Sequence, residues 1–173
     1  PGSDKKELIG AYQKLENILR AFEDLEGARE LTLLIIGLQK QFVSPYDEDT
    51  LDSTFRLARI NAYLGNSEEA YTNLDETVAI LEHMHGKDNV ESVEYLNFKL
   101  MLMQKSENID GEIETLNKLV KVMRNTTGEA SLATAEHLNF LVNAYMKKEN
   151  STEARKHCQE ALKINQEILK KNS

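Results

Sequence analysis

The chain has 173 residues, with 29 acidic and 21 basic side chains and a formal net charge of −8. A negative field of this size repels phosphate backbones and anionic lipid surfaces, which argues against nucleic acid or a membrane as a partner. The single cysteine, Cys158, excludes an intrachain disulfide framework and any multi-cysteine zinc site, so we expect a reduced, cytoplasmic setting. The longest apolar-rich run, residues 31–38, is far shorter than the roughly 18 residues of a membrane-spanning helix, and no signal peptide opens the chain.

Composition and hydrophobic periodicity together predict an all-α fold. Only 2 Pro and 8 Gly interrupt a chain rich in Leu, Glu and Lys, which suits long helices better than many short strands. Helical periodicity predicts eight helices, at 4–22, 25–41, 47–64, 67–84, 89–106, 109–126, 130–148 and 151–170. Gly65 predicts a helix stop, with Asn66 or Ser67 capping the next helix. Asp88 to Glu91 resembles a capping box with Asp in place of Ser.

Internal repeats with a period of 42 residues organise these helices into pairs. Leu96-Asn97 recurs as Leu138-Asn139, and Gly86 recurs as Gly128. Four units follow, at roughly 4–43, 44–85, 86–127 and 128–170. Short connections and a fixed period predict antiparallel pairs that stack into one α-solenoid domain, residues 4–173, with a continuous core. Residues 1–3 resemble a cloning remnant.

The fourth unit resembles the tetratricopeptide repeat. The residues that carry the resemblance are Leu138, Leu141, Val142, Tyr145, Ala154, Cys158 and Ala161. The 42-residue period, with Gly86-Lys87-Asp88 before Leu96-Asn97, is similar to the kinesin-light-chain type of this repeat. The resemblance implies an α-α superhelix that serves as a protein-interaction adaptor or scaffold. It is a fold-level motif that many unrelated functions share.

Three residues depart from the pattern of that family. Glu16 stands where a small residue is expected, and we assign it to a polar terminal unit that caps the solenoid. Lys99 replaces an expected Leu and Glu112 replaces an expected Ala within one unit. These two side chains either pair with each other or mark a unit that packs loosely.

No motif predicts catalysis, a metal site or a cofactor. Cys158 is in register with Leu74 and Leu116, which predicts an apolar core filler rather than a nucleophile. His83 and His85 diverge by about 200° on a helix, so we expect them to complement a helix C-terminus rather than share a metal. The chain contains no glycine-rich phosphate loop, nucleophile elbow or His-Glu-x-x-His sequence. We therefore expect a protein without catalysis or cofactors of its own.

The resemblance also implies where a partner binds. In tetratricopeptide repeats the first helix of each unit lines a concave groove, and register places the following ligand-groove candidates there. They are Asn17, Arg20, Phe55, Arg59, Asn97, Met101, Asn139, Asn143 and Met146. Asparagines in such a row can hold the backbone of an extended peptide, and the methionines can supply adaptable apolar contact. The Lys and Asn pattern of the carboxylate clamp is absent, so a chaperone tail is not expected.

These observations predict a non-catalytic module that binds a protein or peptide segment in its groove. One alternative is a structural or self-association segment of a larger protein, for which Ile164, Ile168 and Leu169 in the last helix are the candidate contacts. Another is a regulatory, peptide-sensing domain of a signalling protein, whose active part lies outside this sequence. The identity of the partner is not encoded in any motif of the chain.

Overall fold

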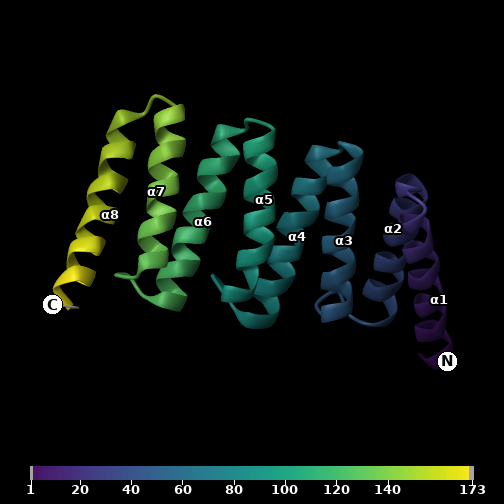
Figure 1. Cartoon of the computed structure of the whole chain (residues 1–173). Coiled ribbons are helices and arrows are strands. Elements are labelled where there is room, and N and C mark those ends of the chain that lie inside the picture. Colours follow the sequence, from purple (N-terminus) through teal and green to yellow (C-terminus); the bar gives the residue numbers. More distant parts are fainter. Residues whose placement is uncertain (1, 172–173) are drawn as a thin grey trace. The chain divides into compact units, whose positions relative to one another are not determined.

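The computed structural model describes residues 2–171 of the chain and the side chains of residues 4–171. These residues form α-helices joined by short turns, and the chain divides after Gly86 into two compact units, which we call unit 1 and unit 2. Unit 1 contains α1 (Gly2–Ala21), α2 (Leu25–Phe42), α3 (Glu48–Leu64) and α4 (Ser67–His85). Unit 2 contains the 3₁₀ turn η1 (Val90–Ser92), α5 (Val93–Lys105), α6 (Ile109–Thr127), α7 (Leu132–Lys147) and α8 (Ser151–Lys171). Each unit therefore holds two repeats (Figure 1).

The all-α fold and the eight predicted helices are confirmed across the described residues. Most boundaries fall within two residues of the prediction, and the exception is α5. Its predicted first turn is the 3₁₀ turn η1, where the Asn89 side chain accepts a hydrogen bond from the backbone N–H of Ser92 at 3.0 Å. The cap is thus Asn89 and not Asp88, whose φ of 51° lies in the left-handed region. The single-domain organisation with one continuous core stays a prediction.

Side-chain caps begin most of the helices. Asp24, Asp47 and Asn108 each accept a hydrogen bond from the backbone N–H three residues later, at 2.8–2.9 Å. Ser131 and Asn150 do the same for α7 and α8, at 3.1 and 3.2 Å. Each bond satisfies a donor that the first turn of a helix otherwise leaves without a partner. Capping therefore fixes where these five helices begin, whereas Asn66 at the start of α4 forms no such side-chain bond.

The turn inside every helix pair has one backbone conformation, and it recurs with the 42-residue period. Its central residue lies in the left-handed region at Glu23 (φ 62°), Gly65 (φ 82°), Glu107 (φ 55°) and Glu149 (φ 58°). Only Gly65 adopts this conformation without a steric cost to a Cβ atom. The repeat is therefore a repeat of backbone geometry even where the turn sequence differs.

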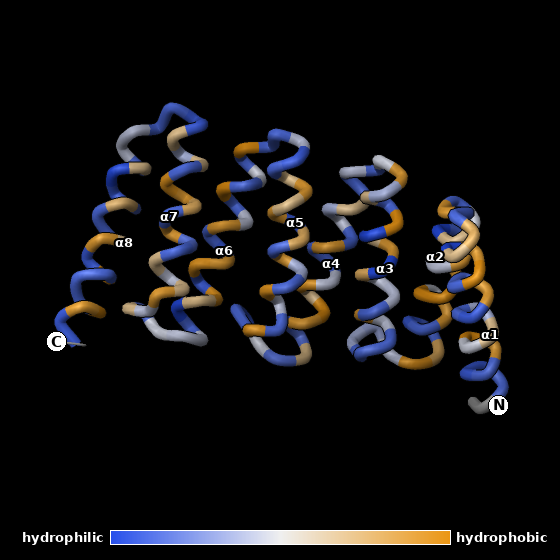
Figure 2. Tube along the Cα trace, in the orientation of Figure 1, coloured by the Kyte–Doolittle hydropathy of each residue, from blue (hydrophilic) through white to orange (hydrophobic). Residues whose placement is uncertain are grey.

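Each unit has its own apolar core, formed where consecutive helices pack. In unit 1 the fully buried Ile35 and Leu74 lie among helices that pack in chain order from α1 to α4. In unit 2 Leu116, Leu119 and Leu138 occupy the same role between α5 and α8. Apolar residues recur along every helix pair in Figure 2. The small residues Ala28, Ala70 and Ala154, which recur at intervals that are multiples of 42 residues, are all buried, as close packing of paired helices requires.

Candidate partner-binding surface

The predicted groove residues lie on the first helix of each pair, outside the apolar cores. In unit 1, Asn17, Arg20 and Arg59 are exposed and Phe55 is half-buried. In unit 2 all five candidates are exposed, namely Asn97, Met101, Asn139, Asn143 and Met146. Their role in binding stays a prediction.

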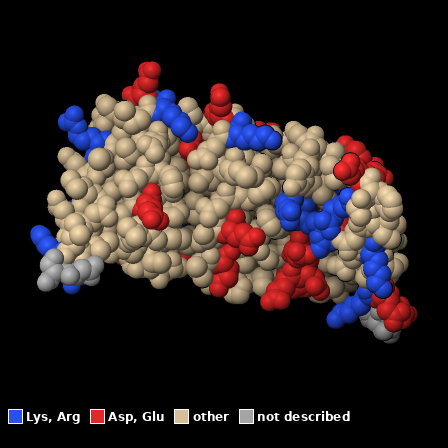
Figure 3. Space-filling view, in the orientation of Figure 1, with Lys and Arg blue, Asp and Glu red and all other residues tan. Residues whose placement is uncertain are grey.

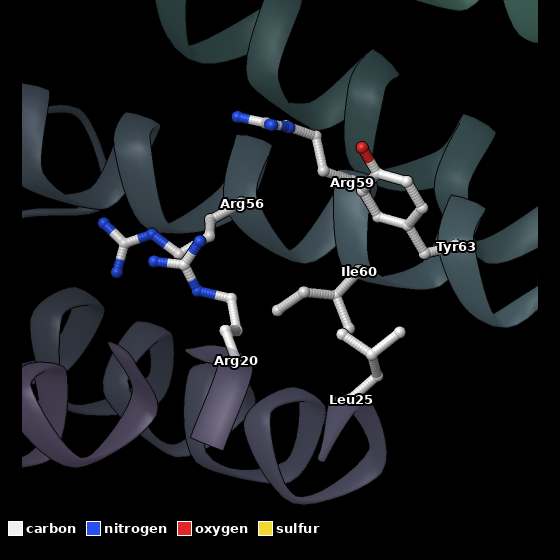
Figure 4. A pocket seen from close by; sticks show the side chains of 6 residues that line it. All are labelled: Arg20, Leu25, Arg56, Arg59, Ile60 and Tyr63. Carbon is white, nitrogen blue, oxygen red and sulfur yellow. The ribbon is translucent and has the colours of Figure 1, made fainter. Parts of the chain in front are cut away.

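Unit 1 brings two of these candidates into one pocket, at the C-terminal ends of α1 and α3. The pocket has a volume of about 180 Å³ and is lined by Arg20, Leu25, Arg56, Arg59, Ile60 and Tyr63. Figure 4 shows Arg20 and Leu25 entering from α1 and the start of α2, with the other four side chains on α3. Leu25 and Ile60 form an apolar floor; in Figure 4 the guanidinium groups of Arg20 and Arg56 lie together on one side of it, and that of Arg59 points away from it. The volume lies below the roughly 300–1,000 Å³ of small-molecule sites, so it suits one or two side chains.

A buried carboxylate holds two of the three arginines. Glu16 is fully buried and lies 2.6 Å from Arg20 Nε and 3.1 Å from Arg56 Nη1. The expectation that Glu16 is a polar cap of the terminal unit is therefore wrong. Its charge is removed from water and is compensated by two guanidinium groups, because an ionised carboxylate is not stable alone in a core. Arg20 also donates to Asn17 Oδ1 at 2.5 Å, which fixes its orientation further.

The third arginine, Arg59, is the one whose charge no carboxylate of the described residues compensates. Arg56 also pairs with Asp52, so two carboxylates compensate two arginines. Arg59 stands over the ring of Phe55, 6.0 Å from its centroid, and within the described residues it forms no ion pair. In Figure 3, basic side chains gather over α3 beside α1, with acidic side chains below them. The pocket therefore carries about one net positive charge beside an exposed aromatic ring, Tyr63.

A second pocket of unit 1 is larger and has mixed charge. It has a volume of about 390 Å³ and is lined by Arg29, Leu33, Leu57, Asn61, Glu68, Glu69, Thr72 and Asn73. Arg29 donates to Asn61 Oδ1 at 2.8 Å, and Asn61 donates to Asn73 Oδ1 at 2.9 Å. This chain of hydrogen bonds connects α2, α3 and α4. Three polar side chains of this pocket, Arg29, Asn61 and Asn73, are thus already engaged with one another.

In unit 2 the departures from the repeat pattern form a polar cluster. Glu112, at a position where the other three repeats have Ala, is buried and lies 3.0 Å from Lys147 Nζ. Gln104 Nε2 also donates to Glu112, at 3.0 Å. Glu112 is thus compensated by α5 and α7, the neighbours of its own helix. The pairing of Lys99 with Glu112 stays a prediction.

Cys158 is exposed, so its predicted place as a core filler is wrong. Its counterpart one period earlier, Leu116, is fully buried on α6, a helix that packs against both α5 and α7. No described helix packs on the same face of α8, and the thiol therefore meets solvent. The buried side of α8 instead contains Ile164, one of the contacts expected for self-association, and His157.

His157 is the buried titratable group of α8. Its ring stacks on Tyr145 with centroids 5.4 Å apart, and its nitrogens lie 3.7 and 3.8 Å from Glu153 and Glu160. Burial lowers the pKa of His157 below its ordinary value, and the neighbouring Lys156 lowers that pKa further. The two carboxylates act in the opposite direction but do not outweigh burial. His83, in contrast, stacks on Tyr46 at 3.8 Å near the end of α4.

Across residues 2–171 no three His, Cys, Asp or Glu side chains are grouped so as to hold a metal ion. None of the helices in that range combines the length and apolar character required to span a bilayer.

Sequence reasoning missed four of the six residues that line the arginine pocket. Leu25, Ile60 and Tyr63 belong to no motif of the repeat pattern. Arg56 carried a usable signal, since Glu16 precedes it by 40 residues, close to one repeat period. Opposite charges at that separation lie on neighbouring first helices, where they can meet.

Comparisons with known proteins match this architecture. Residues 134–173, which cover most of α7 and α8, match the tetratricopeptide repeat family. BtubC (BKLC) from P. vanneervenii has a TM-score of 0.65 at 15% identity, covering 95% of this chain and 65% of that protein. A putative kinesin light chain with nearly identical TPR-like repeats from Podosopora anserina has a TM-score of 0.65 at 18% identity, covering 92% and 76%. No curated protein matches the chain.

Identities this low show the fold alone, and the chain spans 65% of the length of BtubC. The family match, in contrast, covers most of the fourth repeat, whose residues from Leu138 to Ala161 carry the sequence resemblance. The predicted resemblance is confirmed: the last helix pair matches a tetratricopeptide repeat, and the chain has the fold of kinesin-light-chain-like tetratricopeptide repeat proteins.

Proposed function

We propose that the protein is a non-catalytic interaction module that binds an extended segment of a partner protein on the exposed faces of its first helices. The observation that carries the proposal is the pocket between α1 and α3, which contains two predicted groove residues, Arg20 and Arg59. Exposed side chains on α5 and α7 support it, because they lie on the equivalent faces of unit 2. A cytoplasmic setting belongs to the same proposal.

Two classes of side chain divide the work of binding. Asn97, Asn139 and Asn143 each offer a donor and an acceptor, so they can pair with a peptide backbone whatever its sequence. Met101 and Met146 are half or more exposed and can adapt to different apolar side chains. Packed helices present these groups already ordered, so the ordering cost of binding falls mainly on the partner segment.

An array of random ten-residue peptides, probed with the labelled chain, tests this function. We expect a subset of peptides to bind, and we expect the double variant Asn139→Ala with Asn143→Ala to weaken their binding by about thirtyfold, since each of the two lost hydrogen bonds costs on the order of 1 kcal/mol. Asn125→Ala is the matched control, because Asn125 is exposed on α6. An array on which no peptide binds would contradict the proposed function.

Self-association is a second candidate, favoured by the apolar faces of α1 and α8. Leu8, Leu15 and Ile18 are about half exposed, whereas their counterparts in α3 and α7 are buried. Leu162 of α8 is also exposed, whereas its counterpart in α6, Val120, is buried. These faces correspond to the two sides of the contact between successive repeats, so one copy could continue the repeat series of another.

Light scattering across a hundredfold range of protein concentration separates this candidate from the first. Self-association predicts a mass that rises with concentration and that falls to the monomer value in Leu15→Glu or Leu162→Glu. Val90→Glu is the control, since Val90 is exposed outside both faces. A monomer throughout the range would exclude self-association and leave peptide binding unaffected.

A further inference from the structure

We propose that the arginine pocket of unit 1 recognises a single acidic side chain next to an apolar one, in a partner segment whose flanking residues are basic. The inference rests on the proposed function, and it names the chemistry of the bound segment. Three observations carry it: the residual charge of Arg59, the apolar floor of the pocket and the charge of the surrounding unit.

The residual charge selects an anion. Arg20 and Arg56 are already compensated by Glu16 and Asp52, whereas Arg59 lies over the Phe55 ring and forms no ion pair within the described residues. A guanidinium group presents a planar fork of donors that matches a carboxylate, and such charge-assisted bonds are stronger than neutral ones. One acidic side chain therefore neutralises the remaining positive charge of the pocket, and a second acidic side chain would have no cation to pair with.

The floor of the pocket selects the neighbour of that acid. Ile60 is buried at the base, and Leu25 and the exposed ring of Tyr63 lie beside it (Figure 4). A volume of about 180 Å³ is larger than a lone carboxylate requires. An apolar side chain placed next to the acid would fill the remaining space and remove Leu25 and Tyr63 from water.

The charge of the unit selects the flanking residues. Unit 1 has 16 acidic and 8 basic side chains, and unit 2 has 13 of each, which together make the totals of the chain. The whole net charge of −8 therefore belongs to unit 1, yet three of the four arginines of that unit line this one pocket. A uniformly acidic segment would be repelled on approach, whereas a basic segment with one acid would be attracted and then fixed in register.

A simpler explanation of the arginines is complementation of helix C-termini, where cations are favourable. It accounts for Arg20, in the last turn of α1, but not for Arg56 or Arg59, which lie before the last turn of α3. Glu16 and Asp52 compensate Arg20 and Arg56, so Arg59 is the arginine that neither a helix C-terminus nor a carboxylate of the described residues accounts for.

Fluorescence anisotropy with designed peptides tests the inference on the full chain. The probe is an eight-residue labelled peptide with a central glutamate–leucine pair and one lysine on each side. Three other peptides replace the glutamate by glutamine, the leucine by serine, or both lysines by aspartate. We expect the probe to bind at least tenfold more tightly than the glutamine peptide, and both other changes to weaken binding severalfold.

Matched variants locate the effect in the pocket. Arg59→Gln should abolish the preference for glutamate over glutamine, whereas Arg155→Gln should leave it unchanged, since Arg155 is an exposed arginine of α8. Tyr63→Ala should reduce the preference for leucine over serine. Circular dichroism confirms that each variant retains its helices, and Arg59→Lys should recover part of the discrimination.

The remaining outcomes separate the inference from the function on which it rests. Equal binding of the glutamate and glutamine peptides, or discrimination that survives Arg59→Gln, would overturn the acidic preference while binding itself stands. Tighter binding of the aspartate-flanked peptide would overturn the basic flanks. Release of the probe by inorganic phosphate, but not by chloride at equal ionic strength, together with no preference for leucine, would indicate a site for free anions and overturn the peptide assignment. Peptide arrays without any binding would instead contradict the proposed function.

Discussion

Glu16 is the residue whose structural role differs most from its role in the repeat pattern. The carboxylate is fully buried between Arg20 and Arg56, and removing one partner of a buried ion pair leaves uncompensated charge behind. Both arginines are partly exposed, so water recovers part of that cost. The pair therefore stabilises the contact between α1 and α3 and orients the pocket at the same time.

Glu16→Gln should lower the free energy of unfolding by about 2 kcal/mol, measured by urea denaturation. Glu30→Gln is the control, because Glu30 is exposed on α2 and loses the same charge. An equal and small effect of both substitutions would show that the buried carboxylate contributes nothing beyond its shape.

Cys158 should behave as a surface thiol. We expect it to react with a thiol reagent in the native protein nearly as fast as after denaturation, because its side chain is exposed. Cys158→Ser should change the free energy of unfolding by no more than about 0.5 kcal/mol. Native labelling that is slow until the chain unfolds would mean that another surface covers this face of α8.

His157 should make stability depend on pH near neutrality. Its folded pKa is lowered by burial, so the unfolded chain binds its proton more readily than the folded chain does. The stabilisation is complete above the unfolded pKa of about 6.5 and is lost as the pH falls through that value towards the folded pKa. Glu153, Lys156 and Glu160 on α8, Arg124 on α6 and Tyr145 on α7 surround the ring.

Denaturant midpoints between pH 8 and pH 5 measure this dependence. As the pH is lowered from 8 to 5, we expect the free energy of unfolding to fall more steeply in the natural chain than in His157→Phe. The phenylalanine ring can still stack on Tyr145. The other three histidines remain in both proteins, so the difference isolates His157. Parallel pH profiles would show that burial does not control this histidine.

At the scale of elements, the turn within each helix pair stores a small conformational cost. Glu107 has a φ of 55°, where a side chain is unfavourable, whereas Gly65 occupies the equivalent turn of unit 1 without that cost. Glu107→Gly should therefore raise the free energy of unfolding by about 0.5 kcal/mol, after the entropy of glycine in the unfolded chain is deducted. The measurement is again urea denaturation.

Glu114→Gly supplies the opposite result as a control. Glu114 is exposed in the middle of α6, where glycine weakens a helix by about 1 kcal/mol. If both substitutions destabilise the protein alike, the left-handed conformation of Glu107 carries no cost.

At the scale of the whole molecule, charge is divided unequally between the two units. The net charge of unit 1 is −8, and that of unit 2 is zero. Mutual repulsion among like charges destabilises a compact state and is screened by salt. We expect a rise from about 0.02 to 0.3 M NaCl to increase the hydrogen-exchange protection of α1–α4 more than that of α5–α8. Equal protection of both units would show that local ion pairs, which salt weakens, offset the repulsion.

The fold was readable from the sequence because its determinants are local and repeat. Low Pro and Gly content, helical periodicity and N-cap residues act within a few positions of each other. The 42-residue period then supports each helix assignment by its recurrence in the next repeat. Leu74, Leu116 and Leu138 were placed in the core correctly for this reason. The sequence did not predict the 3₁₀ turn before α5. A cap at Asn89 and one at Asp88 differ by only one residue, and sequence patterns do not resolve helix ends that finely.

The sequence by itself determined the helices, their pairing and the faces on which exposed polar residues such as Asn139 and Asn143 lie. Only the tertiary structure decided what those faces meet. Repeat register assigned Cys158 to the core, but burial depends on a neighbouring helix, and no described helix covers that face of α8. The repeat pattern likewise predicted that Glu16 faces solvent, whereas two arginines from different helices make its burial possible. Periodicity fixes direction along one helix, and the occupant of the space beyond is a property of the packed molecule.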